Sequence, residues 1–294
     1  MNDSLDKIGK WSELKLEIFE KYVRAYTTIL GAKGRKLKYI YIDAFAGAGE
    51  CISKETAEII PGSPLRALEV EEPFDEYHFI DLSQEKISYL KDIVHERFPQ
   101  LVNRIRFYNQ DCNQVLPEIF ETIKWSEYKR ALCFLDPYGL HLKWDVIEKA
   151  GKAGLNEGGR NIIEIFLNFP LMDMHRNIFW KNPANLDDAQ IRRMDDFWGD
   201  NSWKNVTYTT QATLFGEEEV RLTSVMEPLK NAFMKRLKDI AGYRFVVEPL
   251  LVRMEIVGGP PLYYLFFATG NPTGYKIVKN IFDKIRERQL EYGL

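Results

Sequence analysis

The chain has 294 residues, of which 45% are hydrophobic and 28% are charged, and its formal net charge is −3. This composition is typical of a globular protein with one sizeable core, and the small acidic charge argues against a protein that grips nucleic acid over its whole surface. The apolar runs are far shorter than the roughly 20 residues of a membrane span, and the opening segment MNDSLDKIGK does not resemble a signal peptide. We therefore expect a cytoplasmic protein without a membrane partner.

The cysteines predict neither disulfide nor metal chemistry. Cys51, Cys112 and Cys133 are scattered along the chain, without a CxxC pair and without a histidine at ligand spacing. The sequence thus predicts reduced cysteines that mostly pack in the interior, and no metal site.

Residues 11–30 predict an amphipathic helix. Apolar residues recur at every fourth position with Glu and Lys between them, and these positions are Leu14, Ile18, Tyr22, Tyr26 and Leu30. Such a helix must pack its apolar face on another element. We expect it to serve as a brace or as part of a lid.

Strand and helix patterns alternate over residues 38–169. The strand patterns cover 38–45, 76–82, 103–109, 130–136 and 160–169, and helical patterns begin near Pro64, Ser83, Asn113 and Leu142. Most of the strands are continuous apolar runs, as expected of central parallel strands that are buried on both faces. The alternation predicts right-handed crossovers and a doubly wound, mostly parallel α/β sheet.

The pattern changes after Pro170. Residues 171–240 predict a mostly helical insertion, with no strand signals over 171–215 and a long helix from about residue 217. Two strand patterns, 244–257 and 262–270, then follow with a connection so short that they can only pair antiparallel. We expect one domain over 1–294, with a seven-stranded Rossmann-like sheet that includes an antiparallel C-terminal strand.

A glycine-rich turn follows the first strand of this sheet, in the segment YIDAFAGAGE. Asp43 ends the strand, and Phe45, Gly47 and Gly49 form the turn. In an open α/β sheet, ligands bind at the carboxyl ends of the strands, where glycines let the backbone come close to them. The turn fits NAD, a nucleotide or S-adenosylmethionine, but Ile52 replaces the third glycine of the dinucleotide fingerprint, which disfavours NAD.

The next two strands also end in carboxylates. Asp81 can accept hydrogen bonds from ribose hydroxyls, and Asp111 can accept one from an adenine amino group. The alternative is that these acids only end strands beside helix N-caps, with Ser83 and Asn113 as the caps. The ordered series of acids favours a cofactor that contains adenosine.

The fourth strand ends in FLDPYGL, which predicts a site for an amine. Asp136 offers a carboxylate, Pro137 a backbone carbonyl, and Tyr138 an aromatic face. The two oxygens can accept both protons of an exocyclic amino group while the tyrosine stacks on the attached ring. The alternative is an ordinary turn with Asp and Pro at its first two positions.

The fifth strand ends in NFP, and three residues there are candidates for contact with a substrate. Asn168 is expected to line the pocket, and Pro170 to open a helix. His175 and Arg176 follow on that helix. They could bind a substrate phosphate or form a solvated pair.

Together these motifs resemble those of S-adenosylmethionine-dependent amino-methyltransferases. Over most of its length the chain resembles the three-Cys-motif partner protein (TcmP) family, in the segments KLEIFEKYVRAYTTIL, YIDAFAGAGE, PGSPLRAL, YHFIDL, FLDPYGL, FLNFP with the histidine-arginine pair after it, and LYYLFFATGNPTGYKIVKNIF. This resemblance implies a methyltransferase-like fold and a partner similar to a radical S-adenosylmethionine protein, which carries the three cysteines of the family name. The segment DPYG also resembles the DPFG of tRNA guanine-N2 methyltransferases.

The resulting hypothesis is an S-adenosylmethionine-dependent methyltransferase that acts on an exocyclic amine of a nucleic-acid base, in tRNA or DNA. Asp43, Phe45, Gly47, Gly49, Asp81 and Asp111 would bind the cofactor, and Asp136, Pro137 and Tyr138 would hold the amine. Cytosine-C5 methylation is disfavoured, because no proline is followed by the cysteine nucleophile that it needs. The competing hypotheses are a non-catalytic partner subunit that keeps the fold, and an NAD-dependent oxidoreductase, for which an evident proton donor is missing.

Overall fold

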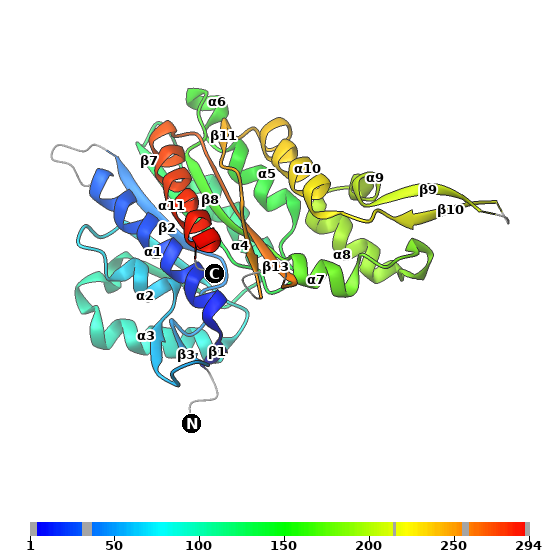
Figure 1. Cartoon of the computed structure of the whole chain (residues 1–294). Helices are drawn as coiled ribbons and strands as arrows, with labels where there is room; N and C mark the ends of the chain where they lie inside the picture. The colour runs from blue at the N-terminus through cyan, green and yellow to red at the C-terminus, as the bar shows by residue number, and fades with distance from the viewer. Residues whose placement is uncertain (1–4, 31–36, 214–215, 255–258, 292–294) are drawn as a thin grey trace.

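A computed structural model describes residues 5–30, 37–213, 216–254 and 259–291. Over these residues the main sheet has eight strands in the order β11-β13-β8-β7-β2-β5-β6, and β12 also pairs with β13 (Figure 1). The bounds are β2 (Lys38–Asp43), β5 (Glu76–Ile80), β6 (Ile105–Tyr108), β7 (Lys129–Leu135), β8 (Ile163–Phe169), β11 (Phe245–Val246), β12 (Leu250–Arg253) and β13 (Pro261–Thr269). The strands from β6 to β8 are parallel, and β13 is antiparallel to β8.

Helices cover both faces of the sheet. They are α1 (Lys10–Leu30), α2 (Ser63–Leu68), α3 (Gln84–Arg97), α4 (Cys112–Thr122), α5 (Trp144–Lys152), α6 (Leu155–Gly158), α7 (Leu171–Asn177), α8 (Asp188–Trp198), α9 (Lys204–Thr207), α10 (Met226–Asp239) and α11 (Pro272–Glu291), with short 3-10 turns at Pro99–Arg104, Pro183–Asn185 and Asn201–Trp203. One core cluster joins α4, α5, α8 and α10 to the sheet, and the other joins α1, α2, α3 and α11 to its opposite face. Parallel strands that are covered on both sides must be apolar throughout, as the buried β7 and β8 are.

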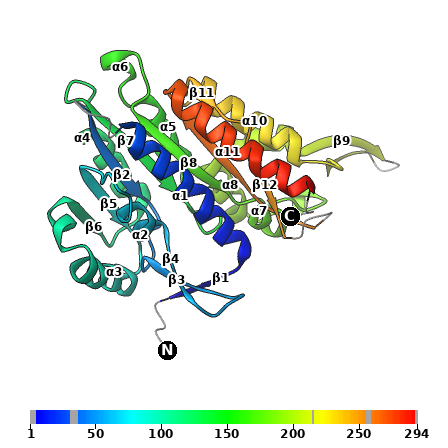
Figure 2. The same cartoon turned by 60° about the vertical axis from the view of Figure 1, so that its left-hand side comes forward.

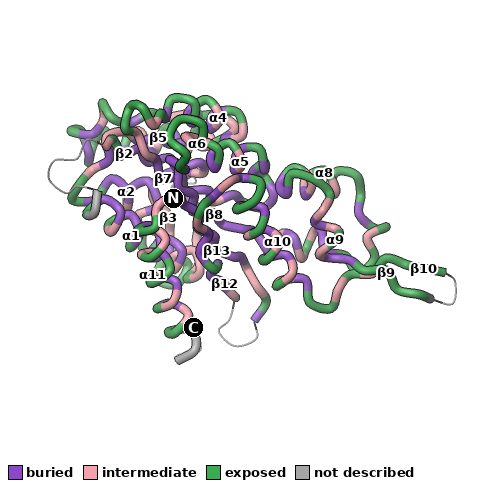
Figure 3. Tube along the Cα trace, turned by 90° about the horizontal axis from the view of Figure 1, so that it is seen from above, coloured by how far each residue is buried: buried purple, intermediate pink, exposed green. Residues whose placement is uncertain are grey.

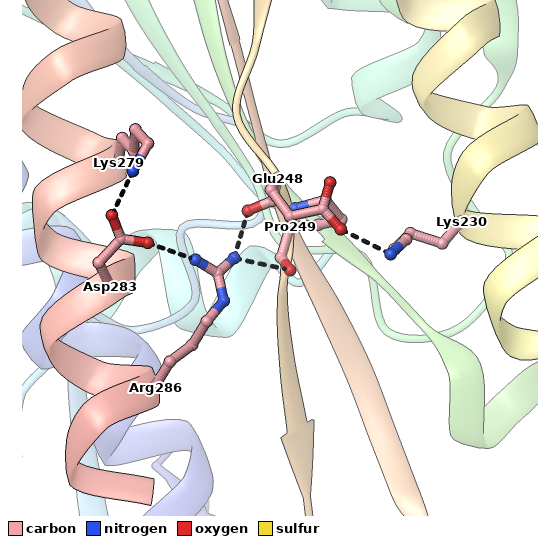
Figure 4. Close-up of polar contacts among 6 residues, drawn as sticks. All are labelled: Lys230, Glu248, Pro249, Lys279, Asp283 and Arg286. Atoms are coloured by element: carbon pink, nitrogen blue, oxygen red, sulfur yellow. Dashed lines mark hydrogen bonds and ion pairs between the residues drawn. The ribbon is translucent and has the colours of Figure 1, made fainter. Parts of the chain in front are cut away.

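The strand expected over 244–257 is divided in two. Between β11 and β12, the Val247 N–H still donates to the Phe267 carbonyl of β13 (3.0 Å), but Glu248 and Pro249 leave the ladder, since a proline has no N–H group to donate. Arg286 of α11 donates to the carbonyl oxygens of Glu248 (2.6 Å) and Pro249 (3.2 Å), while Lys230 of α10 contacts the Glu248 carboxylate (2.5 Å) (Figure 4). This division explains why the described sheet has eight strands where seven were expected. Residues 255–257 of the predicted strand lie outside the described residues.

The inserted region contains a β-ribbon that the sequence did not predict. β9 (Tyr208–Thr213) pairs antiparallel with β10 (Gly216–Arg221), and this ribbon projects from the body of the molecule with most of its described residues exposed (Figures 1 and 3). The expectation of a helix from residue 217 is therefore wrong, because α10 begins at Met226. A ribbon exposed on both faces leaves no apolar alternation in the sequence, so only the threonine-rich segment of β9 indicates a strand.

A small second sheet lies beside the glycine-rich turn. β3 (Glu50–Ser53) and β4 (Ile59–Pro61) form a hairpin directly after the turn, and β1 (Asp6–Ile8) pairs in parallel with β3. Figure 2 shows this sheet next to the start of α1. The N-terminal segment therefore reaches the edge of the main sheet where its parallel strands end.

Candidate active site

The buried carboxyl group of Asp43 fixes the start of the glycine-rich turn through hydrogen bonds. It accepts hydrogen bonds from the Tyr41 hydroxyl (2.8 Å) and from the backbone N–H of Phe45 (3.3 Å). Burial raises its pKa from 3.8 to about 7, although the hydrogen bonds to the carboxylate act in the opposite direction. Asp43 is fully buried, so in this structure it fixes the turn, while Phe45 is partly exposed above it.

The two glycines of the turn adopt left-handed conformations. Gly47 has φ +61° and Gly49 has φ +80°. A Cβ atom on Gly49 would come within 2.5 Å of Leu90, whereas one on Gly47 would meet no atom within 4 Å. Gly49 is thus required by close packing, and Gly47 leaves open space beside the backbone.

The carboxylate of Asp81 is joined to this turn. Its oxygens accept hydrogen bonds from the backbone N–H groups of Gly47 (2.9 Å) and Ser83 (2.8 Å). Each carboxylate oxygen retains a further acceptor position. The sheet therefore brings together two residues that the sequence placed in one site.

Leu82 is a candidate that the sequence reasoning missed. It follows Asp81 and is 74% exposed. The side-chain amide of Asn109 donates to the carbonyl oxygens of Asp81 (3.2 Å) and Leu82 (2.7 Å), which fixes this stretch of backbone. An exposed apolar side chain next to a strand-end acid can contact the flat face of a base. Its position directly after the acid Asp81 is the sequence feature that could have identified it.

Asp111 lies at the start of α4 and is itself the helix cap. Its carboxylate accepts hydrogen bonds from the backbone and side-chain N–H groups of Asn113, both at 2.9 Å, so the cap is Asp111 and not Asn113, which the alternative interpretation had proposed. Ser83 does cap its helix, α3. Asn113 also donates to the His141 carbonyl (2.8 Å) and accepts from the Lys143 N–H (2.8 Å). These bonds hold the Asp111 region against the loop that follows β7.

Asp136 is held by two donors from distant parts of the chain. The Lys15 ammonium of α1 lies 2.5 Å from Asp136 Oδ1, and the Asn168 amide of β8 donates to the same oxygen (2.8 Å). The Lys15 side chain is 9% exposed and that of Asp136 is 23% exposed. Among the described residues, no hydrogen bond joins Asp136 Oδ2 to the protein. Lys15 was not predicted, because a lysine in an amphipathic helix is usually solvated.

The other two residues of the acceptor motif differ sharply in exposure. Pro137 is buried, whereas Tyr138 is 92% exposed. The next residue, Gly139, has φ +79°, and a Cβ atom there would come within 3.0 Å of the Asp173 carboxylate on α7. The loop therefore packs against α7 and leaves the tyrosine ring free for a ligand.

His175 and Arg176 on α7 do not form the solvated pair given as one alternative. His175 is partly buried and its ring packs edge-on against Phe179, with 5.4 Å between the ring centroids. Burial, followed by the nearby Arg221 cation, lowers the His175 pKa below 6.5. Arg176 is exposed at the surface. Of the two side chains, Arg176 is therefore the one that is directly available to a phosphate.

A surface hollow of about 470 Å³ lies away from this arrangement. Its lining includes Phe120, Lys124, Lys149 and Lys152, at the carboxyl ends of α4 and α5. In a parallel α/β sheet the helices end at the edge opposite the carboxyl ends of the strands, so this hollow is not part of the candidate site. Within the described ranges, no group of three or more His, Cys, Asp or Glu side chains could hold a metal ion, and no helix is long and apolar enough to cross a membrane.

No protein-family model and no curated protein matches the chain. Among solved structures it is similar to protein LPL1258 from Legionella pneumophila, of the family DUF519, with a TM-score of 0.50 and 10% identity over 94% of this chain and 91% of the other. It is also similar to the methyltransferase domain of bacterial CtHen1-C (TM-score 0.40, 14% identity, 86% and 100% covered) and to an S-adenosylmethionine-dependent methyltransferase from Agrobacterium tumefaciens (0.39, 12%, 89% and 62%). At these identities the similarity concerns the fold alone.

The fold class predicted from the sequence is confirmed. The chain has a Rossmann-like α/β fold, with a mostly parallel, doubly wound sheet and an antiparallel strand β13 beside β8. Membership of the TcmP family, which no family model supports, stays a prediction.

Proposed function

We propose that this protein is an S-adenosylmethionine-dependent methyltransferase that acts on an exocyclic amine of a nucleic-acid base. The observation that carries the proposal is the state of Asp136, whose Oδ1 is held by Lys15 and Asn168 while Oδ2 has no partner among the described residues. A fixed carboxylate with one free oxygen, at the edge where the glycine-rich turn lies, can accept an N–H group from an amine.

The residues around the glycine-rich turn fit an adenosine-containing cofactor. The space beside Gly47 allows a ligand to come close to the backbone. Asp81 has acceptor positions left for ribose hydroxyls, the exposed Leu82 offers an apolar surface for adenine, and Asp111 caps α4 after the next strand. When bound, S-adenosylmethionine supplies a methyl group on a positively charged sulfur, which keeps the electron pair of the broken S–C bond.

The chain's own residues orient the acceptor. Asp136 Oδ2 and the Pro137 carbonyl would accept the two N–H protons of the amine, which directs the nitrogen lone pair at the methyl group. The new N–C bond forms from that lone pair, and the surplus proton leaves the nitrogen to water. Holding the two reacting groups in line can offset about 7–11 kcal/mol of the barrier.

A nucleic-acid base is the acceptor that best suits Tyr138. A ring that is 92% exposed contributes little to the core, but it can stack on a flat heterocycle. Trp180, 45% exposed just beyond the end of α7, and the exposed Arg176 supply a second aromatic ring and a cation for a phosphate. A base inside a duplex would have to be flipped out, at a cost of a few kcal/mol.

Two measurements test this proposal. Calorimetry should give micromolar binding of S-adenosylmethionine and S-adenosylhomocysteine, about −8 kcal/mol, with much weaker binding by Asp81→Ala and unchanged binding by Asp92→Ala, an exposed acid on α3. Transfer of labelled methyl to unmodified tRNA transcripts and DNA should then yield a methylated exocyclic amine in digested nucleosides. A protein that binds neither adenosyl compound is not a methyltransferase of this kind.

The second candidate is a non-catalytic subunit that serves a protein partner. The observation in its favour is the β9–β10 ribbon, because a two-stranded ribbon with both faces exposed is marginally stable alone in water. A subunit of this kind would bind its partner through the ribbon and transfer no methyl group. Transfer by the purified protein, with Asp136→Ala inactive, would exclude it.

A further inference from the structure

A lysine occupies a core-facing position of α1. Lys15, Phe19, Tyr22 and Tyr26 recur at the spacing of one helix face, and all four are buried. Phe19 packs on Phe134 of β7, with 4.4 Å between ring centroids, two residues before Asp136. Because a buried ammonium is costly without a partner, the ion pair with Asp136 explains why a lysine is tolerated there.

The first turns of α1 are fixed beside this ion pair. The Tyr263 hydroxyl of β13 donates to the Trp11 carbonyl (2.6 Å), and the Lys15 ammonium lies 5.4 Å from the centroid of the Tyr263 ring. Lys15 and Asn168 together occupy the Oδ1 atom of Asp136. The carboxylate is therefore left with one acceptor oxygen in a fixed direction.

The same N-terminal segment also covers the strand that follows the glycine-rich turn. We call residues 5–15 the N-terminal arm. Within it, β1 pairs with β3, and Asp6 is joined to Lys86 of α3 (2.6 Å). The Cys51 thiol of β3, whose pKa burial raises to about 11, is also influenced by the charges of Asp6, Lys86, Asp136 and Lys15. The arm is thus joined to β3 and α3 at one end, directly after the glycine-rich turn, and to Asp136 through Lys15 at the other.

We infer that the N-terminal arm forms a wall of the methyl-transfer site and that Lys15 is a positioning residue, which directs the free oxygen of Asp136 at the acceptor amine. The inference rests on the proposed function. In this inference, β1 and α1 connect the glycine-rich turn to the carboxylate of Asp136, although both elements precede that turn in the chain. Lys15 acts through Asp136 and does not itself contact the methyl group.

Hydrogen exchange tests the arm without any need for turnover. In Lys15→Met, amides of residues 5–15 should exchange about tenfold faster than in the wild type, and in Lys15→Arg they should stay close to it. Lys21→Met is the matched control, because Lys21 lies exposed on the same helix beside Glu17. S-adenosylhomocysteine should slow the exchange of the arm in the wild type. Unchanged exchange in Lys15→Met, or bound ligand that leaves the arm unaffected, would overturn the inference.

Methyl transfer to unmodified tRNA transcripts tests the positioning role. Lys15→Met should lower kcat by ~10–100-fold, with little change in the affinity for S-adenosylhomocysteine and partial recovery in Lys15→Arg. In an Asp136→Asn background, Lys15→Met should lower kcat by less than about threefold, since the two residues act as a unit. Equal losses in both backgrounds would make Lys15 merely structural. A wild type that binds no adenosyl compound would instead remove the proposed function, and the exchange result in the unliganded protein would still decide whether the ion pair holds the arm.

Discussion

Tyr22 of α1 donates a hydrogen bond to the carboxyl group of Glu164 on β8, inside the core between the helix and the sheet. Thr269 of β13 donates to the other carboxyl oxygen (2.9 Å). Among the described residues, no Lys, Arg or His forms an ion pair with this carboxyl. Burial therefore raises the pKa of Glu164 from 4.5 to about 7, against the lowering effect of the two hydroxyl groups.

This carboxyl predicts a loss of stability as the pH rises. Between about pH 4.5 and 7 the folded state holds a proton that the unfolded state has released, so the free energy of unfolding falls through this window and levels off above it. The full effect is on the order of 3 kcal/mol. Glu164→Gln should be the more stable protein at pH 8 in urea denaturation, with Asp43 contributing the pH dependence that remains. The exposed Glu17→Gln serves as control, and a Glu164→Gln curve parallel to that of the wild type would contradict the assignment.

The two glycines of the turn predict different responses to alanine. Gly49→Ala should cost more than the ~1–2 kcal/mol of a left-handed residue, because its Cβ would also come within 2.5 Å of Leu90. Gly47→Ala should lose only the stability that the left-handed conformation costs an alanine, since its Cβ meets no atom. The added methyl group should, however, weaken S-adenosylhomocysteine binding, because it fills the space beside the turn. Denaturation and calorimetry on both variants check this. Equal stability losses with unchanged binding would argue against a ligand at Gly47.

The site residues that lie at strand ends could be predicted from the sequence. Parallel strands bring their carboxyl ends to one edge, so the turn and the next acid had to be neighbours, and Gly47 does donate to Asp81. The mostly parallel, doubly wound sheet likewise follows from alternating strand and helix patterns. The periodicity of apolar residues and the positions of Gly and Pro are local properties of the sequence. They predict this part of the fold because it is built from successive strand–helix units.

The contacts between distant segments could not be predicted in this way. Lys15 and Asp136 are 121 positions apart, and nothing in the spacing of α1 distinguishes a lysine that faces a carboxylate from one that faces water. The β9–β10 ribbon was missed because its pairing depends on backbone hydrogen bonds and carries no hydrophobic period. The division of the strand at Pro249 has a sequence signal, a proline, but its stabilisation by Arg286 on α11 does not.

The ion pair of Lys15 and Asp136 predicts a stability effect alongside the loss of activity. Asp136→Ala should abolish methyl transfer and cost ~3 kcal/mol, at the lower end of the range for breaking a buried pair, because water reaches part of the Asp136 side chain. The double variant Lys15→Met/Asp136→Ala should regain most of that stability, since no charge is left buried alone, but none of the activity. Urea denaturation of the single and double variants measures this. The Glu17→Gln/Lys21→Met pair, exposed on the same helix, should change stability by less than about 1 kcal/mol.

The exposed ring of Tyr138 predicts a loss of substrate affinity without a loss of stability. Its side chain is 92% exposed, so Tyr138→Ala should leave the urea midpoint and S-adenosylhomocysteine binding unchanged. If the ring stacks on a base, the same variant should lose ~1–3 kcal/mol of affinity for an RNA acceptor, and Tyr138→Phe should keep it because the aromatic face remains. The apparent KM for tRNA transcripts, measured with labelled cofactor in all three proteins, is the deciding quantity. If phenylalanine were as damaging as alanine, the hydroxyl group and not the ring face would be what binds the acceptor.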